Sequence, residues 1–152
     1  MSITGGCYCG GLRYEFEGEP VGTAQCHCRE CQYFTGGEPN QVQMVPLDQF
    51  KYTNGAPETF ARKDLDGAVT REFCRTCGTP MGTRAPHIPG ILILKAGTLD
   101  DPSRHQPGMA IYLCDKQPFH RIASRKGSHR SIKCLVEPGP VSHVSMCRLA
   151  QD

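Results

Sequence analysis

The chain has 152 residues, a formal net charge of +2 and no tryptophan. This length favours a single domain with its own core, and so small a charge excludes the strongly basic class that binds nucleic acids or membrane surfaces. No basic stretch followed by an apolar one opens the sequence, and the longest apolar run, 91–94, is too short to span a bilayer. We therefore expect a cytoplasmic protein with neither a membrane nor a nucleic-acid partner.

Short strands separated by turn signals are predicted along the chain. Leu12, Tyr14 and Phe16 alternate with polar residues, which is the period of a half-buried strand. A hairpin turn is predicted around 66–67, and the most buried strand is expected at 90–97. The other strand signals lie at 41–45, 49–54, 58–63, 69–74 and 109–113.

Helical periodicity is confined to single turns at 29–34 and 47–50. The sequence also contains 17 glycines and 12 prolines, which favour turns and irregular loops. The predicted class is therefore mainly β, with short antiparallel sheets and little helix.

Close spacing distinguishes most of the ten cysteines. Clusters of this kind chelate metals, whereas disulfide frameworks spread their cysteines along the chain. We therefore predict metal sites rather than disulfides. Seven cysteines fall in C-x-C, C-x-C-x-x-C and C-x-x-C groups: Cys7 and Cys9; Cys26, Cys28 and Cys31; Cys74 and Cys77.

The first and last groups together predict a structural zinc site. Two thiolates from each would complete a tetrahedron of four cysteine sulfurs. Gly78 suits the positive φ of a C-x-x-C turn, and glycines at 5, 6, 10 and 11 let the C-x-C segment curl. Such a site would close a long loop and restrict the unfolded chain.

The central group supplies three sulfurs from one short segment, which predicts an open zinc site. Catalytic zinc sites have three protein ligands and one exchangeable position. The alternative is a second structural site completed by a distant residue. Cys114, Cys134 and Cys147 are the main candidates for that fourth ligand, followed by His27, His87, His105, His120, His129 and His143.

An open zinc site with three cysteine ligands favours thiol chemistry over hydrolysis. Three thiolates donate so much charge that the ion is a poor activator of water, yet it binds a soft fourth ligand well. A thiol entering that position would be held as the nucleophilic thiolate.

Four ordered motifs, GGCYCGGLRY, CHCRECQYFTGG, FCRTCGTPM and KAGTLDDP, resemble the glutathione-dependent formaldehyde-activating enzyme (Gfa/CENP-V) family over roughly residues 4–120. The resemblance implies a zinc-bound β-tent fold of short antiparallel sheets. It assigns the structural zinc to the cysteines at 7, 9, 74 and 77, and the second zinc to those at 26, 28 and 31. The chain departs from the family at Ala110-Ile111-Tyr112, where members often carry a His-Ile-aromatic step.

The function that the resemblance implies is a carbon–sulfur lyase with two Zn²⁺ per chain. It would bind glutathione or a related thiol at the second zinc and add it to a small aldehyde such as formaldehyde. The alternatives are a non-catalytic thiol carrier and a zinc-stabilised interaction module. The expected partners are the thiol and the aldehyde, and homo-oligomerisation stays open.

After residue 122 the composition changes. The segment 123–152 is basic at its start and weakly periodic. We predict a zinc-binding domain over 1–122 and a basic C-terminal tail over 123–152. The tail is expected to be loosely packed and solvated; the alternative is a segment that covers the site or contacts an anionic partner.

Overall fold

The computed structural model describes residues 2–122, and this part of the chain divides into two compact units. One unit contains 2–23 and 42–106, and the other contains 24–41 and 107–122. Strands outnumber helices in the described chain taken together, which confirms the predicted mainly β class. The predicted tail over 123–152 lies outside the described residues, and its separation from the domain stays a prediction.

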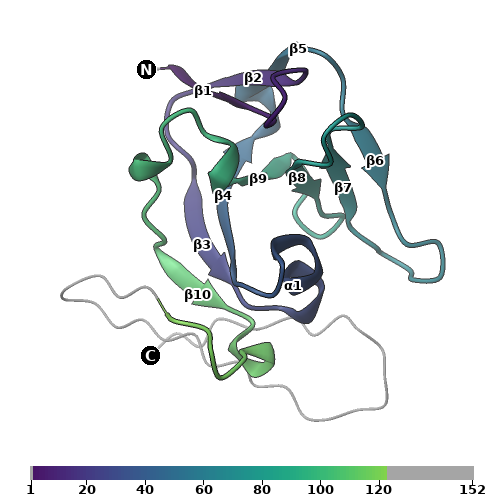
Figure 1. The fold of residues 1–152 in the computed structure, drawn as a ribbon, viewed down its shortest axis with the longest axis vertical. Coiled ribbons are helices and arrows are strands. Elements are labelled where there is room, and N and C mark those ends of the chain that lie inside the picture. Colours follow the sequence, from purple (N-terminus) through teal and green to yellow (C-terminus); the bar gives the residue numbers. More distant parts are fainter. Residues whose placement is uncertain (1, 123–152) are drawn as a thin grey trace. The chain divides into compact units, whose positions relative to one another are not determined.

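Within the described chain, the strands of the first unit form a three-stranded antiparallel sheet in the order β1-β2-β5 and an antiparallel run in the order β4-β9-β8-β7-β6 (Figure 1). Their bounds are β1 Ser2–Gly6, β2 Arg13–Glu17, β4 Asn40–Pro46, β5 Phe50–Asn54, β6 Glu58–Phe60, β7 Thr70–Phe73, β8 Pro80–Arg84 and β9 Ile91–Lys95. This unit also contains three 3₁₀ turns: η1 Leu47–Gln49 joins β4 to β5, and η2 Ala96–Thr98 and η3 Pro102–Arg104 follow β9.

Alternation along the strands produces the core of this unit. Tyr14 and Phe16 in β2 are buried, while their strand neighbours are not fully buried. Leu92 and Leu94 in β9 are completely buried, and the register places Leu92 opposite Val45 of β4. These side chains belong to one apolar cluster, which also contains Cys7 and Cys74. Burial of such large side chains stabilises the fold by roughly 1.5–3 kcal/mol each.

The second unit is smaller and holds a parallel pair of strands. β3 (Gly22–Cys26) pairs with β10 (Met109–Ile111), with Ile111 opposite Cys26. After β3 the chain enters helix α1 (Arg29–Thr35), which is capped by Gly36 with φ 72°. A 3₁₀ turn, η4 (Leu113–Asp115), follows β10. No helix within 2–122 is long and apolar enough to cross a membrane.

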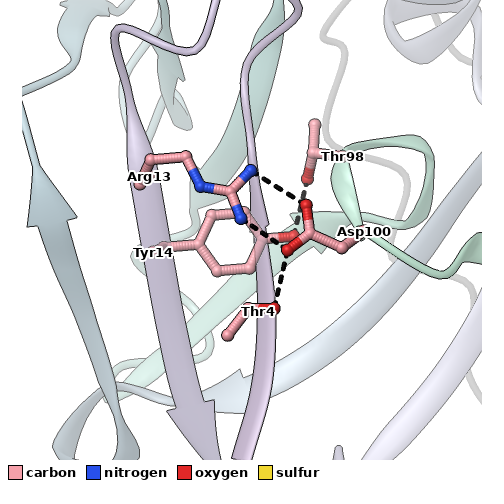
Figure 2. Close-up of polar contacts among 5 residues, drawn as sticks. All are labelled: Thr4, Arg13, Tyr14, Thr98 and Asp100. Atoms are coloured by element: carbon pink, nitrogen blue, oxygen red, sulfur yellow. Dashed lines mark hydrogen bonds and ion pairs between the residues drawn. The ribbon is translucent and has the colours of Figure 1, made fainter.

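A polar cluster ties β1 and β2 to the loop that follows η2 (Figure 2). The Arg13 guanidinium donates two hydrogen bonds to the Asp100 carboxylate, one of them 2.8 Å long, and the Thr4 hydroxyl donates a third at 2.6 Å. The Tyr14 and Thr98 hydroxyls lie 2.9 Å apart. The Arg13 guanidinium, with help from Thr4, holds the pKa of Asp100 below its usual range, so the ion pair is intact at neutral pH. This cluster fixes the strand ends that flank Cys7 and Cys9.

The strands expected at 41–45, 49–54 and 90–97 form as β4, β5 and β9, and both single helical turns appear as α1 and η1. The hairpin around 66–67 is wider than predicted, because pairing between β6 and β7 ends at Phe60 opposite Arg71. The sequence reading missed β1, β3 and β8, whose glycines, polar residues or proline obscure the two-residue period.

Gly5 is required by a close approach between backbones. A Cβ at this position would lie 2.2 Å from the Tyr14 hydroxyl oxygen and 2.3 Å from the Thr98 carbonyl oxygen. We expect Gly5→Ala to lower the free energy of unfolding by roughly 1–3 kcal/mol, the usual cost of overpacking. Urea denaturation of the metal-loaded protein measures this. Gly97→Ala is the matched control, because a Cβ there meets nothing within 4 Å; equal losses in the two variants would contradict the argument.

Candidate metal centres

The first candidate centre joins two loops of the first unit. The sulfurs of Cys7, Cys9, Cys74 and Cys77 all lie within 4.8 Å of one another. The Sγ–Sγ distance is 3.5 Å between Cys7 and Cys9 and 3.7 Å between Cys9 and Cys74. Zn–S bonds of about 2.3 Å require tetrahedral edges of about 3.8 Å, whereas a disulfide would need about 2.05 Å. The quartet therefore has the spacing of a tetrahedral thiolate site.

Local backbone turns present these sulfurs. The Gly10 N–H donates to the Cys7 carbonyl at 3.0 Å, and Gly10 takes φ 76°, so the C-x-C segment curls as expected. In the second loop the Gly78 N–H donates to the Cys74 carbonyl at 2.8 Å, with φ 72° at Gly78. These left-handed positions suit glycine because it lacks a Cβ.

Backbone and hydroxyl donors surround the quartet. Burial opposes ionisation of Cys7, but the Leu12 N–H and the thiols of Cys9 and Cys74 outweigh it and lower its pKa. The Thr79 hydroxyl and backbone N–H lower the pKa of Cys77 to about 5. The same Thr79 hydroxyl oxygen accepts the Tyr8 N–H at 3.1 Å, which links the two loops. At Cys7 and Cys77 these donors favour the thiolate, the form that binds a metal, whereas the neighbouring thiols raise the pKa of Cys9 to about 12.

The second candidate centre lies wholly in the second unit. The sulfurs of Cys26, Cys28 and Cys31 lie within 4.8 Å of one another, and over residues 2–122 no further Cys, His, Asp or Glu joins them. Cys26 and Cys31 are buried, whereas Cys28 is partly exposed. Cys28 is thus the most exposed residue of the trio.

The three sulfurs lie so close together that ionising them without a cation is unfavourable. The neighbouring thiols Cys28 and Cys31, together with burial, raise the pKa of Cys26. Adjacent thiolates repel one another in a poorly solvated site, and a cation relieves that repulsion. The donor set therefore suits a thiophilic metal ion such as zinc.

The start of α1 orients the trio. The Cys28 sulfur caps the helix by accepting the Cys31 N–H at 3.3 Å, and the Arg29 N–H donates to the Asp115 carboxylate at 3.0 Å. The Gln32 amide donates to the carbonyls of His27, at 2.8 Å, and Asp115, at 3.0 Å. These bonds hold the cysteine segment against the turn that follows β10.

Asn40 contacts the trio directly. Its buried side-chain amide donates to the Cys31 sulfur across 3.4 Å. A donor to a thiolate sulfur disperses its charge and orients it toward the metal. Local spacing gave no signal for this residue, because it lies nine positions after Cys31.

Two of the histidines considered as fourth ligands contact each other instead. The Nδ1 atoms of His27 and His120 lie 3.0 Å apart, and His120 Nε2 donates to the Gly37 carbonyl at 2.7 Å. Because His120 Nδ1 also accepts the Gln117 N–H, the proton between the rings belongs to His27 Nδ1. Burial and the neighbouring ring lower the pKa of His27 to about 4, so the His27 ring is neutral at physiological pH.

Comparisons with known proteins bear on these centres. The model of the family described as "Glutathione-dependent formaldehyde-activating enzyme" matches residues 2–115. The chain belongs to this family. A Rhodobacter sphaeroides protein of known crystal structure shares the fold, with a TM-score of 0.53 and 18% identity over 64% of this chain and 87% of that one. A search of curated proteins gave no match.

The family match covers all seven clustered cysteines, and the structure brings them into the two groups that the sequence predicted. Cys114 is exposed and lies outside both groups. His87 and His105 are also outside them. The remaining fourth-ligand candidates, Cys134, Cys147, His129 and His143, lie outside the described residues.

The two centres are expected to differ in their effect on folding. Structural zinc contributes roughly 10–16 kcal/mol of binding free energy in small zinc peptides. This is comparable to or larger than the total free energy of unfolding of a typical domain, which is ~5–15 kcal/mol. Cys74→Ser removes a buried ligand that links loops 65 residues apart and should give unfolded or insoluble protein. Cys28→Ser should give a folded protein that lacks one metal. Thermal melting and metal content measure both, and equal melting temperatures would contradict the distinction.

The Asn40 contact predicts a selective loss of metal affinity. Asn40→Leu keeps the branched shape of the side chain but removes the donor to Cys31, and loss of such a partner typically weakens binding by about 10–100-fold. Competition with a chromophoric chelator measures this, and the quartet serves as the internal control. A parallel loss at both centres would indicate general unfolding instead.

Proposed function

We propose that the protein is a zinc-dependent carbon–sulfur lyase that adds glutathione or a related small thiol to a small aldehyde such as formaldehyde. The trio of Cys26, Cys28 and Cys31 carries the proposal, because it offers three sulfurs without a fourth ligand among the described residues. A zinc ion bound there would supply one exchangeable position at which a small thiol is held as its thiolate. The family match supports this choice of thiol and aldehyde.

The chain's own residues make the trio suited to this role. Cys26 and Cys31 are buried, backbone and amide donors bond to the sulfurs of Cys28 and Cys31, and Cys28 is partly exposed to solvent. Holding the sulfur of one reactant in place lowers the entropic cost of a two-molecule addition. The quartet of Cys7, Cys9, Cys74 and Cys77 contributes stability to the other unit and takes no part in the proposed chemistry.

The open site predicts a defined response to glutathione. We expect the triple variant Cys114→Ser, Cys134→Ser, Cys147→Ser to retain two zinc ions per chain. It should still bind glutathione with release of about one proton near neutral pH, because the thiol must ionise to bind. Isothermal titration in buffers of different ionisation enthalpy measures the proton.

Loss of one zinc ion from the triple variant, or binding without proton release, would contradict the open site. Cys28→Ser is the matched negative control and should not bind the thiol. Stopped-flow rates of formaldehyde addition then separate an enzyme from a thiol carrier. An enzyme raises the rate in proportion to its concentration, while a carrier leaves it at the uncatalysed value.

A further inference from the structure

The four cysteines of the first candidate centre differ in their exposure to solvent. Cys9 is exposed and Cys77 is partly exposed, whereas Cys7 and Cys74 are buried. The turn that carries Cys9, residues 8–11, is exposed throughout. Buried structural cysteines are chemically inert, while exposed ones are open to reagents in solution. One ligand of the quartet is therefore reachable from solvent.

Two buried cysteines lie beside the exposed one. The Cys9 sulfur is 3.5 Å from that of Cys7 and 3.7 Å from that of Cys74. A disulfide bond is about 2.05 Å long, so either pair would have to close by roughly 1.5 Å. Cysteines that respond to oxidants are typically accessible and have a second thiol next to them, with which they form a disulfide. Cys9 meets both conditions.

Within residues 2–122, the cysteines outside the quartet lack this combination. In the second centre Cys28 is partly exposed and the other two cysteines are buried. Cys114 is exposed, but it belongs to neither cysteine group. Partial desolvation of its sulfur and the Asp115 carboxylate raise the pKa of Cys114, so it is a protonated and weakly nucleophilic thiol at neutral pH.

Binding of zinc would also put Cys9 in its nucleophilic form. Cysteine binds a metal as the thiolate, so a thiol that holds its proton in the metal-free quartet gives it up on coordination. Susceptibility to oxidation follows thiolate character and exposure together. In the zinc-loaded protein Cys9 combines these two properties.

We propose that Cys9 is an oxidation site at which hydroperoxides convert the zinc-bound quartet into a disulfide and release the metal. The inference is independent of the proposed thiol addition, because it concerns the other centre and needs neither aldehyde nor catalysis. It gives the quartet a second role, in which the link that stabilises the larger unit is broken by peroxide.

The reaction balances with a hydroperoxide as the only oxidant. The Cys9 thiolate attacks one peroxide oxygen, so that an S–O bond forms, the O–O bond breaks and one hydroxide (or alkoxide) leaves. The thiolate of Cys7 or Cys74 then attacks the resulting sulfenic acid, the S–S bond forms, the S–O bond breaks and a hydroxide leaves. The two thiolates lose two electrons and the peroxide gains two. The zinc ion, left with two sulfur ligands, dissociates.

Peroxide treatment of the full-length zinc-loaded protein tests the assignment. We expect hydrogen peroxide to release one zinc ion per chain first, measured with a chromophoric chelator. Free thiols are then alkylated and the unreduced protein is digested with trypsin. Cys9 should be found in a disulfide with Cys7, inside peptide 1–13, or with Cys74, in a cross-link between peptides 1–13 and 72–75. Oxidation of Cys114 or of the second centre before Cys9 would overturn the proposal.

Reduction by a small thiol distinguishes a disulfide from deeper oxidation. Two thiol molecules supply two electrons by thiol–disulfide exchange and leave as their own disulfide. We therefore expect dithiothreitol with added zinc to restore the metal content of the oxidised protein. Sulfinic and sulfonic acids resist thiols, so a loss of zinc that dithiothreitol does not reverse would contradict the disulfide.

Gly11 offers a way to shield Cys9 without removing a ligand. Apart from its chain neighbours, a Cβ at Gly11 would meet only the Cys9 sulfur within 4 Å, at 3.5 Å, and Gly11 does not take positive φ. Gly11→Ala should therefore keep its zinc and release it at least about twofold more slowly under peroxide, because the rate depends on access to the sulfur.

Gly97→Ala is the matched control, because a Cβ there meets nothing within 4 Å, and it should release zinc at the wild-type rate. Equal rates in the two alanine variants would overturn the role assigned to Cys9.

A core variant separates oxidation of the folded protein from oxidation after unfolding. Val45 is completely buried in the apolar cluster of the larger unit. Val45→Ala should raise the unfolded fraction about tenfold or more, because it leaves a cavity, while all four ligands remain. Zinc release at the wild-type rate is expected if peroxide reacts with exposed Cys9. Release that accelerates as much as unfolding does would show that buried cysteines react in the unfolded chain, and would overturn the proposal.

Discussion

The convergence of four cysteine sulfurs from two distant loops is the constraint on which the larger unit depends. Cys9 and Cys74 are 65 residues apart in sequence, yet their sulfurs lie 3.7 Å from each other. A metal bound there would hold the N-terminal hairpin against the β7–β8 loop, and closing so long a loop strongly restricts the unfolded chain. The apolar core, which includes Cys7 and Cys74, packs directly beside this link.

The second centre follows a different physical logic. Its three sulfurs come from six consecutive residues, so it closes no long loop and adds little to chain restriction. Hydrogen bonds from neighbouring residues fix the positions of its sulfurs. Asn40 bonds to the Cys31 sulfur, and Gln32 and Asp115 hold the start of α1 in place. Within the described residues this site has three sulfur ligands and no fourth, which is the arrangement expected for chemistry rather than for folding.

The smaller unit contains a strained backbone position and a buried histidine pair. Tyr112 carries positive φ, and the His27–His120 pair is buried with His27 Nε2 lacking a hydrogen-bond partner within the described part of the chain. Such features lower the free energy of unfolding, and proteins often retain them at functional sites. Their position beside the trio, like the partial exposure of Cys28, indicates a functional role for the second centre.

The sequence by itself determined the two cysteine groups and the mainly β class, because chelating spacing and strand alternation are local properties. It also predicted positive φ at Gly78, since the C-x-x-C turn is a local structure. The tertiary structure alone decided the pairing of His27 with His120, the contact of Asn40 with Cys31 and the strained turn at Tyr112. These depend on how β10 registers against β3 and where α1 begins. That register is fixed by packing between segments more than 80 residues apart, for which the sequence carries no local signal.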